Sequence, residues 1–191
     1  MDKRIAQLIQ LMSQYDRGDI PRINHFLKVH NLAAVIGMME NIDKDQQLIL
    51  EAAAILHDIG IHVSEQKYGR CDGYLQEREG PAEARRILDA CGGFNQEQVE
   101  RICYLIAHHH TYTDIQGIDY QILVEADSWS ISMKTSYLRR PLKTYAEKFS
   151  KHSQANGCWK ICIWLSIKSR FRMPYKKKYK HYLHEKRLQF F

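Results

Sequence analysis

The sequence predicts an all-α fold for residues 1–128. Apolar residues in this part recur at intervals of three and four, the spacing of one helix face. Aspartate, asparagine, proline and glycine, which favour helix starts and stops, separate the apolar runs. Nothing in this part alternates between apolar and polar residues as a half-buried strand would. We therefore expect a helical bundle of about five or six helices.

Two helices are predicted before the most apolar segment. The apolar residues within 4–15 fall at helical spacing. Gly18 and Pro21 then break the run, and proline is well tolerated in the first turn of a helix. The second helix should begin there, continue to about Glu40, and carry His25 on its length.

The third predicted helix is apolar on nearly every side and ends in two polar residues. Asp43 is in place to cap its first turn. Residues 52–56 are all apolar, and His57 and Asp58 follow directly. Gly60 comes next, where a helix would end. Burying such a pair without a partner would cost several kcal/mol, so the pair predicts a cation or a dense hydrogen-bond network.

A long polar loop and three further helical segments complete this part. Residues 61–79 are predicted to form the loop, which at this length is usually functional or mobile. Helices are expected at residues 80–91, from Asn95 to an end in the run 108–111, and at residues 119–127. Asn95, with a glutamine three residues later, gives the capping-box signature of a helix start.

Charge divides the chain near residue 128. Residues 1–128 contain 12 Lys and Arg against 20 Asp and Glu, a net charge of −8, whereas residues 129–191 contain 16 against 2, a net charge of +14. An acidic body argues against a nucleic-acid polymer as its ligand. Only the basic tail suits such a partner, through the run 176–180 with aromatic residues nearby, although charge runs are more often solvated.

Residues 129–191 form a basic extension for which we predict no fold. Acidic residues are nearly absent from it and its apolar spacing is irregular. These features suggest a poorly ordered, acquired or frameshifted C-terminus. Translation of the other two reading frames after codon 128 tests the frameshift hypothesis, because one of them should then continue an amphipathic helix.

Cysteine usage and hydropathy predict a cytoplasmic protein without membrane contact. The five cysteines are an odd number without a Cys-x-x-Cys pair, which favours reduced thiols. The first residues lack the apolar segment of a signal peptide, and no apolar run approaches the length of a membrane span. The sequence does not indicate an oligomeric state.

Side chains that bind metals end or line several of the predicted helices. They are His25, His57, Asp58, Asp127 and the run His108-His109-His110. Helical bundles build metal sites from such imidazoles and carboxylates on several helices. Successive helical side chains diverge by about 100°, so the three histidines of the run cannot all face one site.

The order of these residues resembles that of the HD-domain superfamily of metal-dependent phosphohydrolases. Three segments are similar to its first-histidine helix, its namesake motif and its closing aspartate helix: Arg22-x-x-His25-x-x-x-Val29-x-x-x-Ala33, residues 54–60 and residues 125–127. Residues 80–84 and the pair His109-His110 resemble extended members, in which further histidines support a second metal and bind substrate. The resemblance covers residues 20–128 and is closest to small stand-alone bacterial members.

The resemblance implies a hydrolase acting on a small phosphorylated metabolite or nucleotide. One or two divalent ions (Mn, Mg, Co, Ni, Fe or Zn) would be held by His25, His57, Asp58 and Asp127. A metal-activated water would attack phosphorus, and Asp58 would bridge two ions if a second is present. His109 or His110 would bind the phosphate or protonate the leaving oxygen.

Further substrate contacts are expected from Lys67 and Arg70 in the predicted loop, together with His109. A solvated loop accounts for Lys67 and Arg70 equally well. The lysine that often follows the family's HD-x-G motif is replaced by Ile61, so that phosphate contact is missing. His62 is expected to be a loop surface residue, and His30 a core residue or a neighbour of the ligands.

Two other functions stay open. Some relatives of this helical fold use a di-iron centre for oxygenation, which bound iron and oxygen-dependent turnover would reveal. The chain would otherwise be a non-catalytic regulatory or binding module, for which we expect no bound ion and no change in melting on addition of Mn²⁺.

Overall fold

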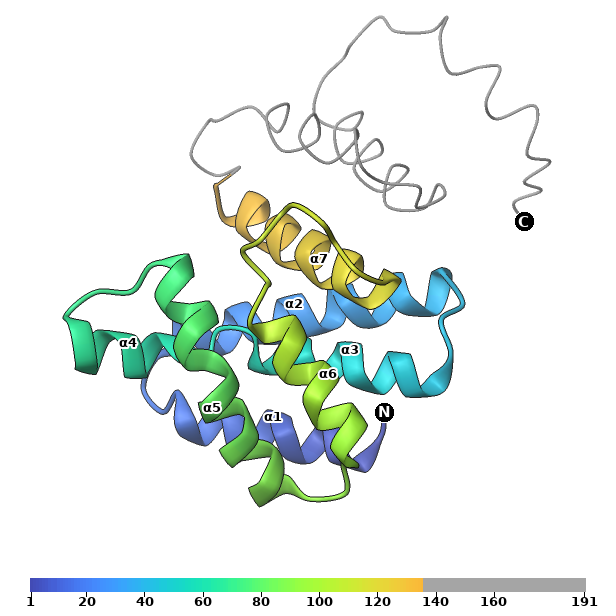
Figure 1. Cartoon of the computed structure of the whole chain (residues 1–191), viewed down its shortest axis with the longest axis horizontal. Coiled ribbons are helices and arrows are strands. Elements are labelled where there is room, and N and C mark those ends of the chain that lie inside the picture. The colour runs from blue at the N-terminus through green and yellow to red at the C-terminus, as the bar shows by residue number, and fades with distance from the viewer. Residues whose placement is uncertain (136–191) are drawn as a thin grey trace, which may run out of the picture. The chain divides into compact units, whose positions relative to one another are not determined.

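The computed structural model describes residues 1–135, which are helical apart from the connections, the longest of them over residues 107–117 (Figure 1). The described residues contain no strand, so the all-α prediction is confirmed for them. Their helices are α1 (Lys3–Tyr15), α2 (Ile20–Met39), α3 (Lys44–Leu56), α4 (Gly60–Tyr68), α5 (Gly73–Cys91), α6 (Gln96–Ile106) and α7 (Ile118–Thr135). The predictions made for the tail beyond residue 135, including the nucleic-acid contact, lie outside the described residues.

Helix α3 is the centre of this arrangement. It packs against α1, α2, α6 and α7, which surround it in Figure 1. Residues 52–56 are completely buried, as expected of a helical segment in which every residue is apolar. The polar pair that follows α3 therefore emerges inside the bundle.

The predicted helix starts are confirmed where a capping side chain marks them. The Asp43 carboxylate accepts hydrogen bonds from the backbone N–H groups of Asp45 and Gln46 at the start of α3. Asn95 and Gln98 form the predicted capping box at the start of α6. These caps set where each helix begins, and hence which of its residues face the core.

The predicted loop over residues 61–79 is wrong. Helix α4 occupies residues 60–68, and α5 begins at Gly73, where Asp72 caps it by accepting the N–H of Leu75. Gly69 ends α4 in the left-handed conformation that glycine adopts easily. The segment is polar because α4 buries only a narrow strip, Gly60 and Ser64, one turn apart.

Gly60 opens α4, whereas the sequence suggested that it would end a helix. Its hydrogen atoms permit a close approach: a Cβ there would lie 2.6 Å from the Gln76 carbonyl oxygen and 2.9 Å from the Gly80 nitrogen. A Cβ on Gly80 would lie 2.7 Å from Ile106 Cγ2. These two glycines let α4, α5 and α6 pack closely beside the end of α3.

Helix α7 closes the bundle over α2 and α3 (Figure 1). It runs to Thr135, past residue 128, where the basic extension was expected to begin. Its inward residues from Ile122 to Ala126 are buried, which directs the following Asp127 toward the core. None of the described helices is long and apolar enough to cross a membrane.

Candidate metal centre

The structure brings together the four residues predicted to bind a metal. His25 Nε2 on α2 lies 3.2 Å from His57 Nε2 and 3.3 Å from Asp58 Oδ2, both just after α3. Asp127 Oδ1 on α7 lies 3.1 Å from His25 Nε2 and 3.7 Å from His57 Nε2. Side chains separated by up to about a hundred positions in sequence thus converge at one point.

The cluster is buried on most sides. His57 is inaccessible, and His25 and Asp127 are nearly so. The Asp58 side chain is 22% exposed, and it is therefore the member of the four through which solvent reaches the cluster. A small molecule approaching the cluster would meet Asp58 first.

Backbone and hydroxyl partners orient the two imidazoles. His57 Nδ1 lies 2.9 Å from the Ala54 carbonyl oxygen, which can only accept, so Nδ1 carries the proton. His25 Nδ1 lies 3.1 Å from Ser130 Oγ, a hydroxyl that can accept a hydrogen bond from it or donate one to it. The hydrogen bond on one ring nitrogen leaves the other as the metal-binding one. With Nδ1 protonated on both rings, both Nε2 lone pairs point at each other and at the carboxylates.

Such an arrangement fits a divalent cation. Ligand atoms about 2.1 Å from one ion lie about 3.0–3.4 Å apart in octahedral or tetrahedral geometry, close to the separations observed. Asp127 Oδ1 is fully buried and lacks a well-aligned hydrogen-bond donor. Buried oxygen and nitrogen lone pairs that face one another repel unless a positive charge lies between them. The donor set of imidazole and carboxylate suits first-row ions and Mg²⁺.

The pKa values of His57 and Asp58 also indicate that positive charge is favourable within the cluster. Burial opposes protonation of His57, but the negative charge of Asp58 and a hydrogen bond to it raise the pKa of His57 to about 9. Burial likewise opposes ionisation of Asp58, yet the positive charge of a protonated His57 and the contacts with His109 and His25 hold the pKa of its carboxyl well below the usual value. A proton on His57 takes the place that a cation would fill.

A second group of ligands lies on the other side of Asp58. One donor atom each of Asp58, His109 and His110 lies within 4.8 Å of the others. His109 Nε2 is 3.7 Å from Asp58 Oδ1, while His109 Nδ1 donates to the Ile106 carbonyl oxygen at 2.7 Å. His109 Nε2 is buried and has no hydrogen-bond partner, so its lone pair also faces the cluster. Asp58 is common to both groups and is in place to bridge two ions.

His108 turns away from both groups, in keeping with the divergence of successive side chains. Its Nδ1 donates to the Tyr104 carbonyl oxygen at 2.7 Å, and its ring lies 4.3 Å from the Tyr104 ring. Of the three consecutive histidines, the pair predicted from the family resemblance is therefore the pair that reaches the site.

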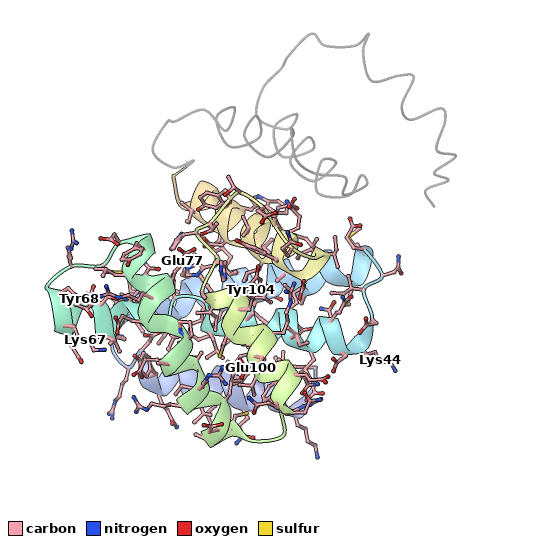
Figure 2. All side chains as sticks on the ribbon, in the orientation of Figure 1. Lys44, Lys67, Tyr68, Glu77, Glu100 and Tyr104 are labelled. Carbon is pink, nitrogen blue, oxygen red and sulfur yellow. The ribbon has the colours of Figure 1, made fainter. Side chains whose placement is uncertain are left out.

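Lys67 and Arg70 engage carboxylates outside the cluster. Lys67 Nζ lies 2.6 Å from Glu79 Oε2, and Arg70 Nη1 lies 3.8 Å from Asp72 Oδ2. Figure 2 shows Lys67 and its neighbour Tyr68 on α4, at the edge of the helical array. Both basic side chains are more than half exposed. Their role in substrate binding stays a prediction.

The two remaining histidines of interest lie in separate networks. His30 is buried, with Nε2 3.0 Å from Glu51 Oε2, and is a core residue as expected. His62 was expected on a surface loop, but it lies in α4, with Nε2 2.9 Å from Asp16 Oδ1 and Nδ1 2.9 Å from Arg22 Nη1. Through Arg22, these contacts hold α2 against α4 one turn before His25.

Three side chains beside the cluster escaped prediction from sequence: Ser130, Gln76 and Glu77. Ser130 contacts His25, whereas Gln76 and Glu77 contact His110. Ser130 lies three residues after Asp127, and this helical spacing was a signal that it shares the inward face. No comparable signal exists for Gln76 and Glu77, because the sequence pattern predicts a loop where their helix lies.

Comparison with protein families agrees with this geometry. The family model of the HD domain matches residues 22–150, and the chain belongs to this family. HD domains bind divalent metals, and members of the family are generally metal-dependent phosphohydrolases. The match includes His25, His57, Asp58 and Asp127, and it extends beyond residue 128. No curated protein matches the chain, and neither does any solved structure.

Proposed function

We propose that this HD-domain protein is a metal-dependent phosphohydrolase that acts on a small phosphorylated metabolite or nucleotide. The observation that carries the proposal is the convergence of His25, His57, Asp58 and Asp127, with a buried carboxylate oxygen that has no hydrogen-bond donor of its own. The acidic charge of residues 1–128 favours a small substrate over a nucleic-acid polymer.

His25, His57 and Asp58 would hold the first ion, joined by Asp127, whose Oδ1 contacts both histidines. Asp58, His109 and His110 would hold a second. Bound there, a divalent ion supplies a nucleophilic hydroxide at neutral pH and offsets the charge of a phosphate group. The residues themselves contribute orientation: Ala54 and Ser130 direct the imidazoles inward, and burial excludes bulk water from most sides of the cluster.

His109 is placed for a second role. Its unpartnered Nε2 lies beside the exposed edge of Asp58, where a substrate would enter. From this position the imidazole can contact a phosphate oxygen or exchange a proton with a leaving oxygen. Which of these it does depends on whether Nε2 is taken by an ion.

The proposal is tested with the full chain, purified without chelator and assayed with Mn²⁺, Co²⁺ and Mg²⁺ on generic phosphoesters and nucleotides. We expect metal-dependent release of phosphate, reduced about 100-fold or more by His57→Ala, Asp58→Ala or Asp127→Ala. His108→Ala is a matched control, because its imidazole turns away from the cluster. Hydrolysis that is independent of metal, or unaffected by these substitutions, would contradict the proposal.

The sharing of Asp58 by two ligand groups also favours a second candidate, a di-iron oxygenase. A carboxylate between two histidine-containing groups suits two adjacent iron ions as well as two hydrolytic metals. Iron that co-purifies with the chain, together with oxygen-dependent turnover and no release of phosphate, would select this candidate.

A further inference from the structure

The first two turns of α5 hold the turn that contains His110. Glu77 Oε1 accepts hydrogen bonds from the His110 backbone N–H at 2.9 Å and from the Thr111 hydroxyl at 3.0 Å. Figure 2 labels Glu77 on this helix. A Cβ on Gly73 would lie 3.0 Å from the His110 ring, so the bare backbone of α5 packs against the imidazole. Backbone and ring are thus both fixed by α5.

Gln76 supplies the partner of the His110 ring itself. Gln76 Oε1 lies 3.0 Å from His110 Nε2, and Gln76 Nε2 donates to Cys71 Sγ at 3.1 Å. With its NH₂ group engaged by the sulfur, the amide turns its carbonyl oxygen toward the imidazole. A carbonyl oxygen only accepts, so His110 Nε2 carries the proton and Nδ1 keeps its lone pair.

His110 therefore has the opposite tautomer to His57 and His109, which donate through Nδ1 to the carbonyl oxygens of Ala54 and Ile106. The difference follows from position in the fold. His57 and His109 are held by backbone at the ends of their own helices, whereas His110 is held by a side chain from a neighbouring helix. The tautomer of His110 can consequently be changed by a single substitution elsewhere.

We propose that Gln76 is a positioning residue that holds His110 in the Nε2–H tautomer and leaves Nδ1 free to bind the second ion beside Asp58 and His109. The use of this lone pair rests on the proposed function, whereas the tautomer does not. His110 is then a metal ligand and not the donor of a proton to the leaving group. With His109 Nε2 also bound to that ion, that role falls to solvent.

The tautomer of His110 is open to direct observation. A neutral imidazole carries one proton, and its location on Nε2 or Nδ1 is a measurable property.

The test is long-range ¹H–¹⁵N NMR on the metal-free, full-length protein labelled with ¹⁵N-histidine, with His110 assigned from a His110→Asn variant. We expect a protonated Nε2 in the wild type and in Gln76→Glu, which keeps an acceptor, and loss of this preference in Gln76→Leu. A protonated Nδ1 in the wild type would overturn the proposal, as would an unchanged tautomer in Gln76→Leu. If Gln76→Leu fails to fold, the wild-type and Gln76→Glu spectra still decide.

Metal titration gives a second readout, which is independent of turnover. For Mn²⁺ binding followed by calorimetry, we expect two ions in the wild type, with the weaker one bound about 10–100-fold less tightly in Gln76→Leu. Gln66→Leu, on the exposed face of α4, is the matched control and should leave both sites unchanged. If Gln76→Leu weakened the binding of both ions equally, or of neither ion, the result would count against positioning by Gln76. If the tautomer and the metal affinity respond as expected but no phosphoester is hydrolysed, only the proposed function fails.

Discussion

Asp58 and Asp127 place two carboxylates against His25, His57 and His109 in a space from which water is mostly excluded. Either a cation or added protons must balance these charges, because buried charges need close partners. The pKa of His57 is raised and the pKa of Asp58 is lowered. In the metal-free protein, a proton on His57 therefore balances the charge of the carboxylates. Metal binding and proton binding at His57 should therefore compete.

The first prediction concerns the stability of the metal-free protein as a function of pH. The pKa of His57 is raised from 6.5 to about 9, so its proton stabilises the folded state. This stabilisation is fully present below about pH 6.5 and is lost as the pH rises to 9. We expect the melting temperature of chelator-treated protein to fall across this interval, and to fall less in His57→Gln. A melting temperature that is constant or rises over the interval would contradict the prediction.

The second prediction concerns the hydroxyl that orients His25. Ser130→Ala removes the partner of His25 Nδ1, so the imidazole loses its fixed orientation. Loss of such a partner typically weakens metal binding about 10–100-fold, and we expect that loss for Mn²⁺ measured by calorimetry. Ser13→Ala, which removes a hydroxyl bonded to a backbone carbonyl in α1, is the control and should leave the affinity unchanged.

At the scale of single residues, the sequence predicted the candidate metal ligands but not the side chains that orient them. The candidate metal ligands could be predicted because imidazoles and carboxylates at the ends of apolar helices are costly to bury without a cation or hydrogen-bond partners. Gln76 and Glu77 could not, because an amide and an acid are common on any helix surface, and Ser130 was marked only by its helical spacing from Asp127. Their importance comes from a contact with another helix, which no local pattern records.

Among the elements, α4 and the start of α5 show where helical periodicity fails as a guide. Helix α4 buries Gly60 and Ser64, neither of which is apolar by side chain, so its inward face does not stand out in the sequence. Pro81 suggested a helix start, but it lies inside α5, and proline there removes a backbone donor without ending the helix. The Asp72 cap and Gly69 were the signals of the true boundaries.

The third prediction tests the close contact between α4 and α5. In Gly60→Ala, the new Cβ would meet the backbone of Gln76 and Gly80, which cannot move aside as a side chain can. We expect a loss of about 1–3 kcal/mol in the free energy of unfolding, measured by urea denaturation. Gln66→Ala on the exposed face of the same helix should change it by less than about 0.5 kcal/mol. Equal stability of Gly60→Ala and the wild type would show that the helices are not in such close contact.

For the molecule as a whole, the candidate ligands tie three helices together. His25 belongs to α2, His57 and Asp58 follow α3, and Asp127 belongs to α7. An ion held by all of them links segments that are otherwise joined by apolar packing. Metal and folding stability should therefore be coupled, because a ligand that binds only the folded state stabilises it.

The fourth prediction follows from that coupling. Removal of metal by chelator should lower the melting temperature of the full chain, and added Mn²⁺ should restore it. At a free concentration 100 times the dissociation constant the stabilisation is about 2.7 kcal/mol. The Asp127→Asn variant should lose most of this response, since it removes the charge of the α7 ligand. A response that is the same in the variant would show that α7 takes no part in binding.

The all-α architecture of the described residues followed from apolar spacing and caps, since these act locally. The domain boundary that a sharp change in composition predicts near residue 128 stays a prediction, while α7 runs to Thr135 and the family match to residue 150. Composition reports charge and solvation, whereas helix continuation depends on packing against α2 and α3.

The most direct measurement of the central claim is the metal content of the full chain, purified without chelator and analysed by inductively coupled plasma mass spectrometry. We predict at least one divalent transition-metal or Mg²⁺ ion per chain, retained in His108→Ala and lost in His57→Ala and Asp58→Ala. A wild-type chain that contains no such ion, and that takes up none on dialysis against Mn²⁺, Co²⁺ or Mg²⁺, would contradict the account.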